Sequence, residues 1–285
     1  MALHYSQQQI DQLVNPCASR LAQGGPESFY KIYSDLFAFR QQPEKVYDDF
    51  ICRTLRATAP LNNLNDLITY NALYFAQHLA RFRCLLSLVQ AQRARPVSAP
   101  IRLRVVDYGC GQGLASLALL EHLCPHSRVE IEVHLIEPSA LCLYAASRYV
   151  GAHAERLQGK VQIHTHACTI DQVPADIFSP HQNTVLHLFS NVLDLTGQPD
   201  FDLDPWIQAL REAPGKHLVL GASPAYPGSQ QGFMRMHTHF PHARNLLPSP
   251  RISVRIPAGY TVPSMSGKPI TEAQGSAIAL LINHR

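Results

Sequence analysis

A glycine-rich turn carries the strongest chemical signal in this sequence. Asp107 ends an apolar segment, three glycines follow at positions 109, 111 and 113, and helix-forming residues then continue to Leu123. Glycine weakens regular structure, but it lets the backbone turn sharply and approach a ligand closely. Free N–H groups and the helix dipole at this point favour an anionic or strongly polar ligand group. The candidate ligand-binding residues of the turn are Asp107, Gly109, Cys110, Gly111, Gln112 and Gly113.

The spacing of the glycines distinguishes between classes of nucleotide ligand. A dinucleotide site requires the pattern GxGxxG, and Leu114 stands where its third glycine would be. A Walker A phosphate loop requires Gly-Lys-Ser/Thr, which does not follow the turn. An NAD-dependent oxidoreductase is therefore disfavoured, although it stays open as an alternative.

The segment D-Y-G-C-G-Q-G resembles motif I of the class I S-adenosylmethionine-dependent methyltransferases, and the resemblance extends from about Ile101 to the C-terminus. It implies S-adenosyl-L-methionine as the cofactor, with Asp107 and residues 109–113 facing its methionine end. Glu137 lies 28 residues after Gly109, at the end of the next predicted strand. A carboxylate there can accept two hydrogen bonds from a ribose diol, and the resemblance implies that role for Glu137.

Two further strand ends supply candidate residues. Members of this family often carry an acid just after the third strand, facing the adenine, but Ala167 stands there, so Cys168, Asp171 or the backbone could make that contact. Ser190 and Asn191 end the fourth strand and are expected at the same edge of the sheet. The Asn/Asp-Pro-Pro-aromatic motif typical of amino-methylating enzymes is absent. Asn191 is our candidate catalytic residue; alternatively, its amide caps the next turn.

No metal site is predicted, because His237, His239 and His242 lack the spacing of a helical metal pair and have no acid or cysteine nearby. The seven cysteines form no CxxC pair, which favours reduced thiols. The N-terminal segment does not resemble a signal peptide, and no apolar run approaches about 18 residues. We therefore expect a cytoplasmic protein that does not associate with membranes.

The elements that must position these residues form two regions. Residues 1–95 are predicted to be helical, with helices beginning near Ser6, Pro26, Pro43 and Asn65. From Ile101 onward, short β-rich segments alternate with helical ones, and the predicted strands are 101–109, 129–137, 161–167, 184–190, 216–223, 251–256 and 276–283. This alternation predicts an α/β fold with a Rossmann-like, mostly parallel sheet, helices on both faces and a closing hairpin-like pair of strands.

By analogy with such enzymes, residues 1–95 are expected to form a substrate-recognition or lid region, and residues 96–285 the methyltransferase domain. Tyr70, Asn71 and Tyr74 are candidates for the wall of the site. The stretch from Leu67 to Val106 has no acidic residue, and its arginines could contact the phosphates of RNA. Alternatively, Arg93 and Arg95 lie near a predicted helix C-terminus and interact favourably with the helix dipole. The arginines of this stretch are Arg81, Arg83, Arg93, Arg95, Arg102 and Arg104.

Together these features predict methyl transfer from S-adenosyl-L-methionine to an acceptor that the sequence does not identify. A small molecule, a protein side chain and RNA stay open as acceptors, whereas DNA is not expected. The net charge of +3 does not by itself argue for nucleic acid. No residue stands out as the general base. The alternative from another class is a catalytically silent protein that binds the cofactor and acts as a scaffold.

Overall fold

The structure, a computed structural model, describes residues 5–25, 31–33, 35, 43–54, 59–91, 101–123, 129–157, 159–179, 184–196, 198, 201–226, 228–256 and 270–284. Its N-terminal helices are α1 (Gln7–Gly24), α3 (Pro43–Thr54) and α4 (Leu64–Ala91). Ser6 caps α1, as predicted, because its side chain accepts a hydrogen bond from the backbone of Gln9. Most of the helix predicted from Pro26, together with Arg93 and Arg95, lies outside the described residues.

Strands and helices alternate from Ile101 onward, as predicted. The strands are β1 (Ile101–Tyr108), β2 (Val129–Ile136), β3 (Gly159–His166), β4 (Val185–Ser190), β5 (Gly215–Pro224), β6 (Arg244–Asn245), β7 (Arg251–Arg255) and β8 (Glu272–His284). The helices are α5 (Leu114–Leu123), α6 (Ala140–Ala154), α7 (Asp204–Glu212) and α8 (Gln231–His239). Short 3₁₀ turns are η1 (Ile170–Gln172), η2 (Ala175–Phe178) and η3 (Leu193–Leu195).

The sheet has the order β3-β2-β1-β4-β5-β8-β6, and β7 pairs with β8. Strands β1 to β5 are parallel to one another, whereas β8 runs antiparallel to β5 and β7. The predicted Rossmann-like α/β fold and the closing strand pair are therefore confirmed. The chain leaves β1 toward β2 and later returns to its other side with β4, so the direction of winding reverses between β1 and β4. In such sheets ligands bind beyond the carboxyl ends of the strands at this reversal.

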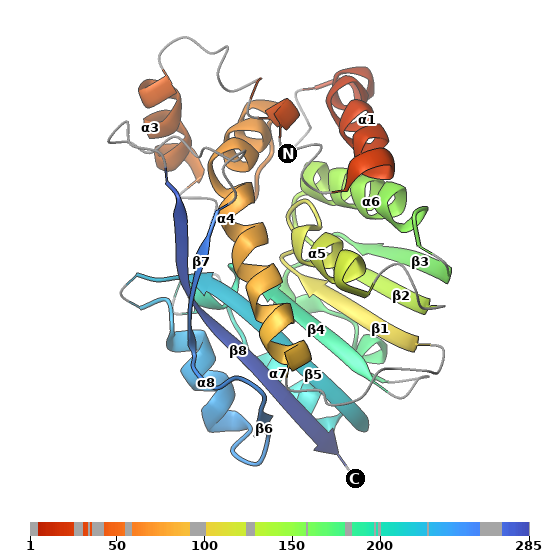
Figure 1. Ribbon diagram of the computed structural model, residues 1–285, viewed down its shortest axis with the longest axis vertical. Helices are drawn as coiled ribbons and strands as arrows, with labels where there is room; N and C mark the ends of the chain where they lie inside the picture. The colour runs from red at the N-terminus through yellow and green to blue at the C-terminus, as the bar shows by residue number, and fades with distance from the viewer. Residues whose placement is uncertain are drawn as a thin grey trace.

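Helices cover both faces of the sheet (Figure 1). On one face, α4, α5 and α6 pack on the strands, and α1 packs on α6. On the other face, α7 and α8 bury Trp206, Phe233 and Met236 against Tyr108 and Phe189. Helix α4 also contacts β5, β7 and β8, so the long N-terminal helix lies directly on the sheet. The division into residues 1–95 and 96–285 stays a prediction.

One helix was not predicted. No helix was predicted for the segment after the fifth predicted strand, but His237 and His239 belong to α8. The helix forms because Phe233, Met236 and Phe240, at spacings of three and four, are buried on one side of it. His237 and His242 are exposed.

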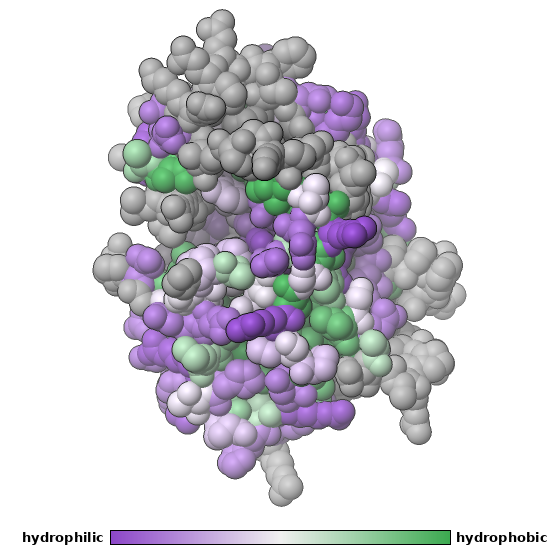
Figure 2. All heavy atoms as spheres, turned by 60° about the vertical axis from the view of Figure 1, so that its left-hand side comes forward, coloured by the Kyte–Doolittle hydropathy of each residue, from purple (hydrophilic) through white to green (hydrophobic). Residues whose placement is uncertain are grey.

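The surface beside α3, β7 and α8 carries small hydrophobic patches within a mostly hydrophilic face (Figure 2). A groove of about 370 Å³ lies between α4 and β7, lined by Ala76, Leu79, Ala80, Arg83, Cys84, Ser87, Val254 and Arg255. Among the described helices, none combines the length and apolar character that a membrane span requires.

Candidate functional site

The glycine turn joins β1 to α5 with three residues in the left-handed region. Gly109 and Gly111 have φ of 54°, and Gly113 has φ of 76°. Side chains rarely adopt such angles, which explains why glycine occupies these positions. The N–H of Cys110 donates to the carbonyl of Ile136 at 3.0 Å, which attaches the turn to the end of β2.

The three glycines do not have the same surroundings. A Cβ atom at Gly109 would lie 2.8 Å from Val192, and one at Gly113 would lie 2.7 Å from Val150, so both glycines permit close packing. A Cβ at Gly111 would meet no atom of the described residues within 4 Å. The backbone of the turn is therefore open to a ligand at Gly111.

Asp107 is completely buried at the end of β1. Its Oδ2 accepts hydrogen bonds from the backbone N–H and the hydroxyl of Ser116, at 3.1 and 2.7 Å. Its Oδ1 is buried and has no hydrogen-bond partner among the described residues. Burial raises the pKa of Asp107 to about 7 in spite of the bonds from Ser116. A cationic group bound at Oδ1 would satisfy this oxygen and favour the carboxylate.

Gln112 and Cys110 are the other side chains of the turn, and both are buried. The Oε1 of Gln112 accepts a hydrogen bond from Nδ2 of Asn71 on α4, whereas its Nε2 has no partner within the described part of the chain. Burial raises the pKa of the Cys110 thiol well above its usual range, so it is a neutral packing group. The turn thus leaves one buried acceptor, on Asp107, and one buried donor, on Gln112, without a partner in the described structure.

Glu137 follows β2 and contacts the turn directly. Its Oε2 accepts the N–H of Gly111 at 3.0 Å, and its Oε1 accepts the N–H of Ser139, at the start of α6, at 2.9 Å. Burial raises the pKa of Glu137, although both backbone bonds oppose this. Each oxygen keeps a second lone pair, so the carboxylate can still accept ribose hydroxyls.

The ends of β3 and β4 lie at the same edge of the sheet. Ala167 is exposed and Cys168 is half-buried directly after β3, where the N–H of Glu137 also bonds the carbonyl of His166 at 3.1 Å. At the end of β4, Asn191 has a φ of 57°, which is unusual for a residue with a side chain. The Nδ2 of Asn191 donates to Oγ of Ser190 at 3.0 Å.

Arg81 of α4 reaches the edge of the sheet where β3 and β4 end. The sequence did not predict this placement. The side chain is buried, and its Nη2 donates to Oδ1 of Asn191 at 3.3 Å. Burial lowers the pKa of Arg81 to about 10, while nearby Asp194 opposes the shift. Asp194 accepts hydrogen bonds from Ser223 at 3.2 Å and from Tyr226 at 2.6 Å. The only signal in the sequence was an arginine flanked by the apolar residues Ala80 and Phe82.

The other described arginines of the acid-free stretch pair within the chain. Arg83 pairs with Glu121 at 2.5 Å, Arg102 with Glu130 at 2.7 Å and Arg104 with Glu132 at 2.9 Å. These arginines therefore do not form an unpaired basic surface for RNA. Of the three α4 residues expected to line the site, Asn71 contacts the glycine turn, whereas Tyr70 and Tyr74 pack on each other with ring centroids 5.4 Å apart.

Comparisons with known proteins give similarity to methyltransferases of solved structure. A candidate class I S-adenosylmethionine-dependent methyltransferase from Listeria monocytogenes is 13% identical with a TM-score of 0.44, covering 97% of this chain and 87% of that one. An S-adenosylmethionine-dependent methyltransferase from Aquifex aeolicus is 10% identical with a TM-score of 0.41, covering 71% and 93%. An arsenic(III) S-adenosylmethionine methyltransferase from Chlamydomonas reinhardtii is 16% identical with a TM-score of 0.40, covering 71% and 73%.

No protein-family model and no curated protein matches the chain. At the identities and TM-scores above, the solved structures do not establish family membership. The function is therefore inferred from the geometry of the site.

Proposed function

We propose that this chain binds S-adenosyl-L-methionine at the glycine turn and transfers its methyl group to an acceptor. The observation that carries the proposal is the pair of buried atoms without partners in the described structure, Oδ1 of Asp107 and Nε2 of Gln112, beside the open backbone of Gly111. An acceptor and a donor of this kind suit the ammonium and carboxylate groups of an amino acid. The residues present therefore fit the methionine end of the cofactor.

The remaining cofactor contacts follow from the strand ends. The second lone pairs on the oxygens of Glu137 would accept the ribose hydroxyls, while the carboxylate keeps the N–H groups of Gly111 and Ser139 in place. Ala167, Cys168 and Ser190 would line the rest of the cofactor site. When bound, the cofactor supplies a methyl group already activated by its sulfonium.

The protein must then hold an acceptor in line with that methyl group and exclude water. Asn191 is the candidate catalytic residue, because Arg81 and Ser190 fix its side-chain amide at the end of β4. Its amide would orient the nucleophile of the acceptor. Asp194, held by Ser223 and Tyr226, is a further polar group near Arg81 that could contact the acceptor. The acceptor itself, whether a small molecule, a protein or RNA, is left open.

Calorimetric titration with S-adenosylhomocysteine and with NAD tests the cofactor, and Gly111→Arg is the decisive variant. We expect S-adenosylhomocysteine to bind the wild type and not the variant, because the new side chain would enter the open space at Gly111. Gly215→Arg is the matched control, since Gly215 also has a positive φ, of 98°, but begins β5 at the opposite edge of the sheet. Equal binding by both variants, or preferential binding of NAD, would contradict the proposal.

Transfer of labelled methyl groups into a cell extract tests catalysis, and protease or ribonuclease treatment of the product then identifies the class of acceptor. We expect a labelled product with the wild type and none with Gly111→Arg. Tight binding of S-adenosylhomocysteine with no labelled product in any fraction would favour the scaffold instead.

A further inference from the structure

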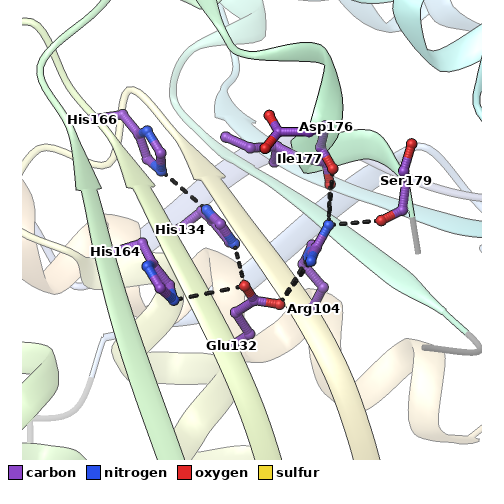
Figure 3. Close-up of polar contacts among 8 residues, drawn as sticks. All are labelled: Arg104, Glu132, His134, His164, His166, Asp176, Ile177 and Ser179. Atoms are coloured by element: carbon purple, nitrogen blue, oxygen red, sulfur yellow. Dashed lines mark hydrogen bonds and ion pairs between the residues drawn. The ribbon is translucent and has the colours of Figure 1, made fainter. Parts of the chain in front are cut away.

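A second cluster of polar side chains lies on the other face of the sheet, where β2 and β3 run side by side (Figure 3). Glu132 and His134 are two residues apart on β2, so they point to the same face. The register pairs His134 with His164 on β3. In the described part of the β3–β4 connection only the short turns η1 and η2 occur, so no α-helix of that connection covers this face.

Three of these side chains bring their ligand atoms together. One atom each from Glu132, His134 and His164 lies within 4.8 Å of the other two. The Oε1 of Glu132 is 3.1 Å from Nε2 of His134 and 3.6 Å from Nε2 of His164. The Nε2 of His134 is buried and makes no hydrogen bond of acceptable geometry to any described residue. Three groups with lone pairs thus lie close enough together to hold one metal ion.

Neighbouring residues orient these groups as the outer shell of a metal site does. The Nδ1 of His134 lies 3.0 Å from Nε2 of His166, and a proton on Nδ1 leaves the lone pair of Nε2 directed toward Glu132. Arg104 donates from Nε at 2.9 Å to Oε2 of Glu132, which leaves Oε1 available. The Nη1 of Arg104 donates to the backbone carbonyls of Asp176, Ile177 and Ser179 at 3.0, 3.3 and 2.7 Å.

We propose that Glu132, His134 and His164 bind one divalent transition-metal ion, with Zn²⁺ as the natural probe. Two imidazole nitrogens and one carboxylate oxygen favour such ions over Mg²⁺ and Ca²⁺. Three protein ligands leave a fourth position for water in a tetrahedral zinc site. The prediction of no metal site was based on the spacing of His237, His239 and His242. It did not take Glu132, His134 and His164 into account.

The metal ion would be bound by side chains of β2 and β3 and would take no part in the methyl-transfer site. Asp107 points to the opposite face, where its carboxylate bonds Ser116 of α5. The inference is thus independent of the proposed function, and its failure would leave that function untouched.

Titration of the full chain, freed of metal by a chelator, with ZnCl₂ and MgCl₂ tests the site. We expect one Zn²⁺ per chain, no comparable binding of Mg²⁺, and a loss of affinity of about 100-fold or more in His164→Ala, since even outer-shell changes cost about 10- to 100-fold. His164 is 46% exposed, so the variant should fold. His237→Ala, an exposed histidine of α8, is the matched control and should bind as the wild type does. Wild-type affinity in His164→Ala, or equal loss in both variants, would show adventitious binding and overturn the proposal.

The variant His164→Cys gives a second readout with Co²⁺ as the probe. A thiolate at this position should add a sulfur-to-cobalt charge-transfer absorption that the wild-type complex lacks. The absence of this absorption while one Co²⁺ is bound would place the metal elsewhere and contradict the proposal.

Discussion

The backbone N–H of Gly111 donates to the carboxylate of Glu137 at 3.0 Å, across 26 residues of sequence. The same carboxylate holds the N–H of Ser139 at 2.9 Å. One acid thereby fixes the glycine turn after β1 against the start of α6. Glu137, which is predicted to bind ribose, therefore also holds the glycine turn and the start of α6 together.

We expect Glu137→Gln to lower both stability and cofactor affinity. Its amide NH₂ would face one of the two backbone N–H groups, and a buried donor left unpaired costs about 1–3 kcal/mol. Urea unfolding and titration with S-adenosylhomocysteine measure the two effects. Glu130→Gln is the control, because Glu130 is exposed in its pair with Arg102 and should cost less than about 1 kcal/mol. Unchanged stability in Glu137→Gln would contradict the assigned role.

Asp107 should make stability depend on pH. Its pKa is raised from 3.8 to about 7 in the folded chain, so between these values the folded state binds more protons than the unfolded state. The free energy of unfolding should therefore fall as pH rises through this window, by at most about 1.4 kcal/mol per pH unit. Asp107→Asn should remove this contribution, while Glu137, whose pKa is also raised, keeps its own. Identical pH profiles for the variant and the wild type would contradict the prediction.

The same carboxylate should couple cofactor binding to pH. An ammonium group at Oδ1 favours the ionised form, so binding of S-adenosylhomocysteine should release a proton near pH 7 and strengthen as pH rises. Calorimetry in buffers of different ionisation enthalpy measures the released proton. A proton release of the same size in Asp107→Asn would assign it to another group.

Asn71 should couple α4 to the cofactor site. Its side chain donates to Gln112 in the turn, so Asn71→Ala should weaken S-adenosylhomocysteine binding by up to about tenfold, the size of a typical net hydrogen bond. Gln77→Ala is the matched control, because Asn71 and Gln77 each donate to the carbonyl four residues earlier on α4, but Gln77 belongs to neither the turn nor the strand ends. Equal affinities in the two variants would remove α4 from the site.

Asn191 allows backbone strain and side-chain function to be separated. Asn191→Gly should keep stability, since glycine tolerates a φ of 57°, whereas Asn191→Ala should cost about 1–2 kcal/mol. Both variants should keep S-adenosylhomocysteine binding and lose methyl transfer. Full transfer activity in Asn191→Gly would exclude a catalytic role for the side chain.

The sequence determined the framework of the site, because local signals carry that information. Glycines at 109, 111 and 113 were recognisable from their spacing, and each has the positive φ that only a glycine accepts readily. The alternation of strands and helices likewise predicted the sheet, since the pattern of buried residues follows the period of each element. The strand ends at Asp107, Glu137 and Asn191 then had to meet at one edge.

Only the tertiary structure decided which side chains meet across the sheet and which atoms lack partners. Arg81 reaches Asn191 because α4 crosses the strands, a placement that no local pattern of α4 specifies. Glu132, His134 and His164 converge because of the register between β2 and β3, and a shift of one residue would send their side chains to opposite faces. Register and helix placement arise from packing between segments distant in sequence, so they become visible only when the chain is folded.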